Sequence, residues 1–218
     1  MTITHHPDPA SLMSFAAGSL GEALSAVVAA HAAVCPRCRA EIRDLEHLGS
    51  VLMQSVASVS AGPVPAVDVQ SVSAAGVDTR LAVPHGPAAP AALSRAMSNR
   101  LGIDLDTIRW RRLGPGVWHH KLPVSEAALG DLRLLRVGPG RRVPEHGHGG
   151  TELTLVLAGA YRDDKGVFGI GDIEDVDAET QHQPVADPQT GCICLLASEK
   201  PARFKGVFSR LLQPLTGL

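Results

Sequence analysis

Aromatic residues are scarce in this chain: they make up 3% of its 218 residues, with two Trp, one Tyr and four Phe. Surfaces that stack on nucleic-acid bases need aromatic side chains, and phosphate-binding surfaces need an excess of basic ones. The chain has 20 Lys and Arg against 22 Asp and Glu, which gives a formal net charge of −2. Composition therefore argues against direct nucleic-acid binding.

Long apolar segments are also missing. The most apolar stretch, residues 26–35, is short and is interrupted by His31, whereas a membrane-spanning helix needs about 20 apolar residues. The first residues lack the cationic region and apolar core of a secretory signal. We expect a cytoplasmic protein that has no membrane partner.

Cysteines are few, and they fall into two close pairs, Cys35/Cys38 and Cys192/Cys194. Without a secretory signal, such pairs are more typical of metal binding or redox chemistry than of structural disulfides. Cys192 and Cys194 alternate along a strand-like segment, which places both side chains on one face. Buried structural thiols are the simpler interpretation of this second pair, and oxidant-sensing thiols are the alternative.

Residues 1–58 have the pattern of a small helical bundle. Asp8-Pro9 predicts a helix start, because an N-cap residue followed by Pro at the first helical position is a common signal. Gly18 can end this helix, and the run from Ser19 to Glu22 fits a capping box at the start of a second one. Local sequence thus indicates two helices before residue 35.

A third helix is expected to begin at Pro36, since proline suits the first helical turn. Apolar residues then recur at helical spacing and predict one buried side. This expected buried side comprises Ile42, Leu45, Leu48 and Leu52.

Residues 59–105 separate the helical part from the rest of the chain. Residues 59–90 are rich in Ala, Val, Ser, Pro and Gly and keep no period for long, which is typical of a linker. Residues 91–101 can form one further short helix. Because of the linker, we expect the C-terminal domain to influence the N-terminal one without belonging to its core.

From residue 106 to residue 218 the pattern changes to short strands. Turn signals such as Gly-Pro-Gly at 114–116 and at 138–140 separate them, and many short strands at close spacing predict an all-β barrel or sandwich. The overall fold class is therefore multidomain α plus β. The expected strands include residues 107–112, 117–122, 132–137, 153–157 and 192–196.

A candidate zinc site lies in the helical part. Zinc takes about four N or S ligands in a tetrahedron, and His31, Cys35 and Cys38 follow the spacing His-x₃-Cys-x₂-Cys. The two cysteines bracket the start of a helix, where free N–H groups favour thiolates. The fourth ligand must come from elsewhere, and His6 is the best candidate with His5 as the alternative. A redox Cys-x-x-Cys motif is the competing interpretation.

This element resembles that of the zinc-binding anti-sigma domains. In that family a small helical bundle binds an extracytoplasmic-function type sigma factor and keeps it from RNA polymerase. The resemblance covers about the first quarter of the chain, and the segment 91–101 can belong to the same module. A zinc-stabilised helical domain with an unrelated partner is the alternative.

A second candidate metal site lies in the strand-rich part. Residues 140–159 have the spacing Gly-x₅-His-x-His-x₃-Glu-x₆-Gly, with His146, His148 and Glu152 at the polar positions. Residues two apart on a strand face the same way, so both imidazoles point inward. His182 is the expected fourth ligand. Three imidazoles and a carboxylate accept Zn, Mn, Fe or Ni, of which we favour Zn.

The same spacing resembles the first cupin motif at every fixed position. The second cupin motif is matched by Gly171-Asp172 and by His182, but Asp177 and Glu179 stand where that family usually has Pro and Gly. The resemblance implies a C-terminal cupin β-barrel over residues 106–218. The alternative is a barrel whose histidines line the interior without a metal.

A zinc anti-sigma domain followed by a metal cupin is the layout of the ChrR-type anti-sigma factors, which this chain resembles. The resemblance implies a negative regulator without catalytic residues. Its N-terminal domain sequesters the sigma factor, and its cupin receives an oxidative signal of the singlet-oxygen type that promotes release. The alternative function is a metal-dependent cupin enzyme of the dioxygenase or isomerase class, with the helical domain as an accessory.

Overall fold

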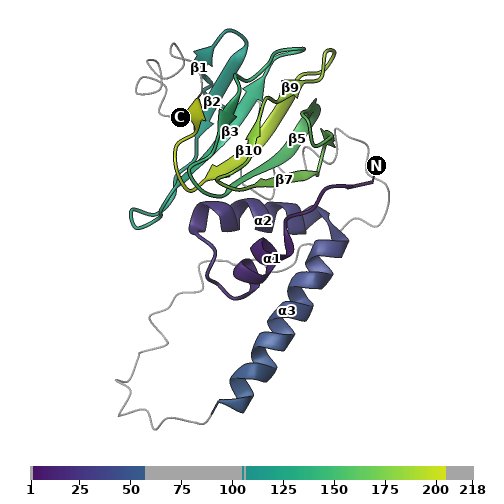
Figure 1. Cartoon of the computed structure of the whole chain (residues 1–218), viewed down its shortest axis with the longest axis vertical. Coiled ribbons are helices and arrows are strands. Elements are labelled where there is room, and N and C mark those ends of the chain that lie inside the picture. Colours follow the sequence, from purple (N-terminus) through teal and green to yellow (C-terminus); the bar gives the residue numbers. More distant parts are fainter. Residues whose placement is uncertain (1, 57–104, 106, 205–218) are drawn as a thin grey trace.

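The computed structural model describes residues 2–56, 105 and 107–204, so most of the expected linker and the expected helix at 91–101 lie outside the described residues. The helices of the described part are α1 (Pro9–Ala16), α2 (Glu22–Val34) and α3 (Pro36–Ser55). In Figure 1, α2 lies against the sheet, and the far end of α3 projects away from it. Of the described helices, none combines the length and the apolar character that crossing a membrane requires.

The start and end of α1 confirm the expectation from sequence. The Asp8 side chain accepts a hydrogen bond from the backbone N–H of Ala10 at 2.8 Å, which satisfies one free N–H of the first turn. Gly18 follows the helix with φ of +68°, a left-handed conformation that costs glycine little. The capping box at Ser19 to Glu22 was wrong: Gly21 is the N-cap, and Glu22 accepts a hydrogen bond from Ser125 N at 2.9 Å instead.

The expected buried side of α3 is correct only near its start. Ile42 is buried and Leu45 is half-buried, but Leu48 is 54% exposed and Leu52 is 58% exposed. The reason is length: α3 has 20 residues, whereas α1 has eight and α2 has 13, so its second half extends beyond the helices that cover its first half (Figure 1).

The described strands form two sheets. The larger has eight strands in the order β1-β2-β3-β10-β5-β6, with β7 and β9 also paired to β5, and the smaller has three in the order β11-β4-β8. The expected all-β barrel or sandwich is thus confirmed as two sheets, which do not form one closed barrel among the described residues. The strands are β1 (Arg111–Gly114), β2 (Val117–Lys121), β3 (Asp131–Val137), β4 (His146–Gly147), β5 (Glu152–Arg162), β6 (Val167–Gly169), β7 (Ile173–Val176), β8 (Gln181–His182), β9 (Val185–Ala186), β10 (Cys192–Ser198) and β11 (Arg203–Phe204).

The physical reason for two sheets lies in strand length and pairing. Strands β4, β8 and β11 have two residues each and pair with one another, whereas the 11-residue β5 pairs with β6, β7, β9 and β10. The first strand also begins later than the expected 107–112, because the N–H of Trp110 bonds to the carbonyl of Ile108 in a turn. The other expected strands are present.

Strand β5 is buried on both of its faces, and one of these faces packs against the helical part of the chain. Glu152 and Thr154 line the space between the two sheets. Leu153 and Leu155 alternate with them and share one apolar core with α2 residues such as Val27. Helix α2 packs against β3, β5 and β10. The expectation that the two parts have separate cores is therefore wrong, because the outer face of the sheet is apolar and α2 covers it.

Two candidate metal centres

The N-terminal centre consists of His6, His31, Cys35 and Cys38, whose donor atoms all lie within 4.8 Å of one another. Sγ of Cys38 is 3.3 Å from Nε2 of His31 and 3.3 Å from Nδ1 of His6. A tetrahedral zinc ion would hold its N and S ligands about 3.6 Å apart. The four side chains thus have both the chemistry and the spacing that zinc requires.

Helix boundaries put these side chains together. His31 is in the last turn of α2, and Cys35 is an extended residue (φ −102°, ψ 105°) that both ends α2 and caps α3. Cys38 follows in the first turn of α3, and His6 lies in the extended segment before α1. His31, Cys35 and Cys38 are buried, and His6 is half-buried.

Of the two candidates for the fourth position, the structure brings His6 to the centre and places His5 elsewhere. Nδ1 of His5 is 3.5 Å from Oδ2 of Asp172. The ring of His5 packs against Phe168 with 4.3 Å between centroids. His5 therefore fixes the N-terminal segment against the sheet instead of joining the cluster.

Burial sets the protonation states at this centre. It lowers the pKa of His31 to about 4, so its imidazole is neutral at pH 7 and has a free lone pair. Nδ1 of His31 donates a hydrogen bond to the carbonyl of Gly171 at 2.9 Å, which leaves Nε2 facing Cys38. Burial raises the pKa of Cys38 to about 12, so metal binding here must displace a thiol proton.

The C-terminal centre consists of His146, His148, Glu152 and His182, which are all buried and whose donor atoms also lie within 4.8 Å of one another. Nε2 of His148 is 3.2 Å from Nε2 of His182. Nδ1 of His148 is 3.3 Å from Oε2 of Glu152. Strand pairing explains the arrangement, because His146 on β4 is opposite His182 on β8, and Glu152 begins β5.

Hydrogen bonds outside this cluster fix two of the imidazoles. Nδ1 of His146 donates to the carbonyl of Pro144 at 2.8 Å. Nδ1 of His182 donates to Oδ2 of Asp163 at 3.0 Å and to Oε1 of Glu174 at 3.1 Å. Such partners set the tautomer and the ring orientation of metal-binding histidines. Both rings therefore turn Nε2 toward the cluster.

A third group that can hold a cation overlaps the second one, since Asp163 and Glu174 also lie close to His182. The other oxygen of Glu174 accepts a hydrogen bond from the hydroxyl of Tyr161 at 2.7 Å. Neither carboxylate was identified from sequence, because each is one of several acids in its segment. Only the pairing of β5 with β7 shows that Glu174 lies on the same face as Thr154.

The electrostatics of the C-terminal centre fit a bound cation. Burial lowers the pKa of His146 to about 4. Burial also opposes a charge on His182, but its hydrogen bonds to Asp163 and Glu174 raise the pKa of that imidazole to about 9, so a metal that binds there must displace a proton. Nδ1 of buried His148 makes no hydrogen bond within the described residues. A divalent cation at this centre would balance the buried Glu152 carboxylate.

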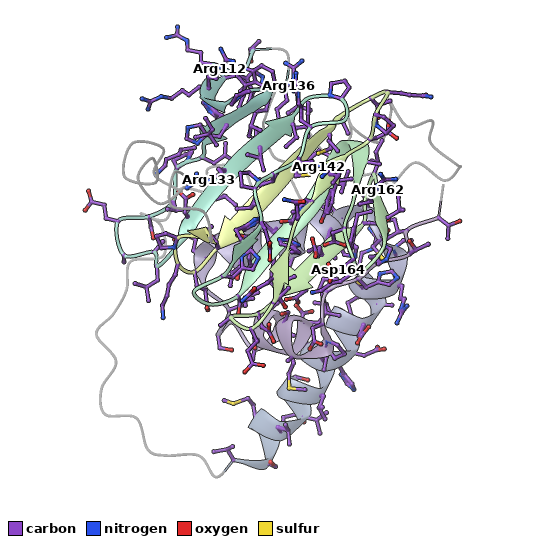
Figure 2. The ribbon with its side chains drawn as sticks, turned by 45° about the horizontal axis from the view of Figure 1, so that its top comes forward. Arg112, Arg133, Arg136, Arg142, Arg162 and Asp164 are labelled. Carbon is purple, nitrogen blue, oxygen red and sulfur yellow. The ribbon has the colours of Figure 1, made fainter. Side chains whose placement is uncertain are left out.

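The C-terminal centre opens onto a cavity of about 560 Å³ whose lining includes His146 and Glu152. Arg133 and Arg142, which also line it, are labelled in Figure 2. A second cavity of about 50 Å³ adjoins the same centre and is lined by Cys192 and Cys194. Small molecules can therefore reach His146 and Glu152 from the larger cavity, and the two buried thiols line the smaller one beside the same two residues.

Comparison with known proteins agrees with both parts of the chain. Residues 98–201 match the family described as the ChrR Cupin-like domain. The anti-sigma-E factor ChrR of Cereibacter sphaeroides is 42% identical over 98% of this chain and 98% of its own length. The crystal structure of Rhodobacter sphaeroides SigE in complex with the anti-sigma ChrR matches with a TM-score of 0.69 and 42% identity, over 90% of this chain and 100% of that one. The chain therefore belongs to the ChrR family of anti-sigma factors.

Proposed function

We propose that this chain is an anti-sigma factor that binds an extracytoplasmic-function type sigma factor and keeps it inactive. The observation that carries this function is 42% identity to an anti-sigma-E factor over 98% of both chains. The structural match to an anti-sigma chain in complex with SigE identifies the class of partner. Sigma factors act on RNA polymerase in the cytoplasm, which is the location that we assign to this protein.

The surface for the sigma factor is the exposed apolar side of α3. Leu48, Val51 and Leu52 share this side, and all three are exposed. Exposed apolar patches on a folded protein mark sites of interaction with other proteins. On this proposal, the residues that we expected to be buried within the helical bundle become buried when the sigma factor binds.

We expect the double variant Leu48→Asp/Leu52→Asp to bind the sigma factor at least about 30-fold more weakly, because it puts charges into the apolar centre of an interface. The change is measured as the Kd of the purified proteins. Ser50→Asp is the matched control, since at 100° per residue Ser50 lies on the opposite side of α3. Equal binding by the double variant and the control would place the interface elsewhere.

Zinc is the metal that we propose for the N-terminal centre, held by His6, His31, Cys35 and Cys38. Two thiolates and two neutral imidazoles make a neutral site around Zn²⁺, so burying it costs little charge desolvation. Structural zinc contributes of order 10 kcal/mol to the folding of small domains. Its function here is to hold α2, α3 and the segment before α1 in the conformation that the sigma factor recognises.

We propose a second metal at the C-terminal centre, held by His146, His148, Glu152 and His182. Zinc is favoured, and Mn, Fe or Ni suit the same ligands. Elemental analysis of the purified protein is expected to give close to two metal equivalents per chain. A single equivalent that disappears when Cys35 and Cys38 are replaced would show that the C-terminal centre holds no metal.

For the domain limits we propose residues 1–58 for the anti-sigma domain, 59–105 for the linker and 106–218 for the cupin domain. The cupin receives the oxidative, singlet-oxygen type signal. Imidazoles and thiols are targets of oxidants, and one cavity beside the C-terminal centre is lined by His146, His182, Cys192 and Cys194. Damage to these side chains can loosen the sheet on which α2 packs.

Co-expression with the sigma factor tests the proposed function. A tagged copy of this chain is expected to co-purify with an extracytoplasmic-function type sigma factor as a stable complex. The cupin-enzyme alternative has less support, because the relative that matches nearly the whole chain is an anti-sigma factor. Turnover of a small substrate by the purified protein, without any sigma-factor binding, would reverse this conclusion.

A further inference from the structure

The two candidate centres share a support. The imidazole of His31 is oriented by a hydrogen bond of 2.9 Å to the carbonyl of Gly171. The imidazole of His182 is oriented by a hydrogen bond of 3.1 Å to the Glu174 carboxylate. These two acceptors are three residues apart in one short segment, Gly171–Glu174, which we call the shared segment.

The residues between them also hold the N-terminal part of the chain. The carboxylate of Asp172 is buried and accepts hydrogen bonds from the backbone N–H groups of Thr4 at 2.7 Å and His5 at 3.0 Å. The N–H of Ile173 bonds to the carbonyl of His5 at 3.3 Å. These contacts fix the backbone directly before His6. Each residue of the shared segment thus bonds to a ligand of one centre or to the residues beside a ligand.

The shared segment is held firmly in the sheet. Its start is bonded to β5 in both directions, from Gly171 N to the carbonyl of Val156 at 2.9 Å and from Val156 N to the carbonyl of Asp172 at 3.0 Å. Gly171 has a φ of +88°, a conformation that side chains with a Cβ rarely adopt. Close-packed interiors transmit displacement because they contain few voids to absorb it.

We propose that the shared segment couples the two centres, so that metal in the C-terminal centre makes the N-terminal centre hold its metal more firmly. Glu174 and Asp172 are then positioning residues, which act on the ligands and do not bind the metals themselves. This coupling rests on the proposed metal binding at both centres. It gives a direct route by which a change inside the cupin reaches the sigma-binding helices.

The coupling has a thermodynamic consequence that can be measured. Loss of an outer hydrogen-bond partner typically lowers the metal affinity of a site 10- to 100-fold. When the C-terminal metal leaves, Nε2 of His182 is no longer held, and only the hydrogen bonds of Nδ1 to Asp163 and Glu174 still fix the ring. We therefore expect release of the N-terminal metal to become about tenfold faster. By thermodynamic linkage, the N-terminal metal increases the metal affinity of the C-terminal centre by a certain factor. The C-terminal metal increases the metal affinity of the N-terminal centre by the same factor.

Cobalt separates the two centres in one measurement on the full-length protein. Only the N-terminal centre has thiolate ligands, so thiolate-to-cobalt charge-transfer absorbance reports that centre alone. Protein loaded with Co²⁺ is challenged with EDTA, and the decay of this absorbance gives the release rate. The variants are Glu152→Ala, which removes a C-terminal ligand, Glu174→Gln, which weakens the support of His182, and the two combined.

We expect Glu152→Ala to increase the release rate about tenfold in the wild-type background and less than twofold in the Glu174→Gln background. Glu22→Gln is the matched control. It alters a carboxylate that also links the two parts of the chain, through Ser125, but that lies outside the shared segment. This control should release cobalt at the wild-type rate. His148→Gln empties the same centre and replaces Glu152→Ala if that variant does not fold.

The outcomes separate the coupling from the proposed function. Two cobalt equivalents in the wild type with no effect of Glu152→Ala on release would overturn the coupling and leave both centres intact. If Glu152→Ala increased the release rate equally in both backgrounds, Glu174 would not transmit the coupling. This result would also overturn the proposal. A single cobalt equivalent would remove the C-terminal metal, and the coupling with it.

Discussion

Replacing Cys38 with Ser is expected to remove the metal from the N-terminal centre and to abolish sigma-factor binding. Cys38 is fully buried, and its Sγ lies 3.3 Å from the nearest nitrogens of His6 and His31. Loss of one ligand removes most of the metal's contribution to folding, which is of order 10 kcal/mol. That contribution is comparable with the whole stability of a typical domain, about 5–15 kcal/mol.

Loss of the N-terminal metal should affect the three helices unequally. The apolar side of α2 is packed on the sheet and does not depend on zinc alone. Helix α3 packs mainly on α1 and α2 instead of on the sheet, so it should lose its arrangement first. Because the proposed sigma-binding surface is on α3, binding is lost even where α2 remains folded. In cells we expect constitutive transcription from the sigma-dependent promoter.

Zinc content, a pull-down of the sigma factor and a promoter reporter measure this result. Cys35→Ser and His31→Ala are expected to behave in the same way. Cys192→Ser is the matched control, because it removes a buried thiol from β10 that belongs to neither proposed ligand set. If the Cys38 variant lost zinc and still bound the sigma factor, zinc would not be needed for the inhibitory conformation.

Variants of the C-terminal centre should show the opposite pattern, with repression kept and induction lost. Glu152 and Thr154 line the interior, while Leu153 and Leu155 on the other face of β5 contact the core around α2. Glu152→Ala therefore removes a metal ligand without changing the surface that supports the helices. A tenfold faster metal release still leaves the tight N-terminal centre filled at equilibrium, so the sigma factor remains bound.

Loss of the C-terminal metal also has a cost in stability. A ligand present at 100 to 1,000 times its Kd stabilises the folded state by about 3–4 kcal/mol. For a chain of this size that corresponds to a decrease in Tm of about 10 °C. Calorimetry of Glu152→Ala, His148→Ala and His182→Ala measures this decrease, and the promoter reporter with and without photo-oxidative stress measures induction.

Two results would contradict this prediction. Full induction in all three variants would separate the metal from the signal. Turnover of a small substrate by the wild type, lost in the same variants, would favour the enzyme alternative. Glu145→Ala is a suitable control, since this exposed carboxylate lies beside His146 in sequence but outside the metal-ligand groups.

Much of the N-terminal centre follows from local sequence. The spacing of His31, Cys35 and Cys38 places one residue at the end of a helix and two around the start of the next, and helix geometry then determines where they meet. Sequence favours His6 as the fourth ligand but keeps His5 as the alternative, because both precede α1. Contact with the sheet decides between them, since Asp172 and Phe168 hold His5 away from the cluster.

In the C-terminal centre, too, the sequence identifies the ligands but not the contacts that fix them. A known motif spacing identifies the four ligands, His146, His148, Glu152 and His182. No such spacing identifies the residues that orient them. Asp163 and Glu174 are separated from His182 by 19 and 8 positions and reach it only through strand pairing. A single sequence does not distinguish them from the surface acids around them.

Sequence alone was sufficient for the fold class, for the helix starts at Pro9 and Pro36, and for the ligands that lie close together within each set, because these depend on short-range spacing and on the chemistry of single side chains. Which apolar residues are covered depends instead on the packing of distant elements. This packing buries Leu153 and Leu155 against α2 and leaves Leu48 and Leu52 exposed, although all four occur in regular apolar patterns. Burial depends on what packs against a side chain, and for α2 the packing partner is a sheet more than a hundred residues later in the chain.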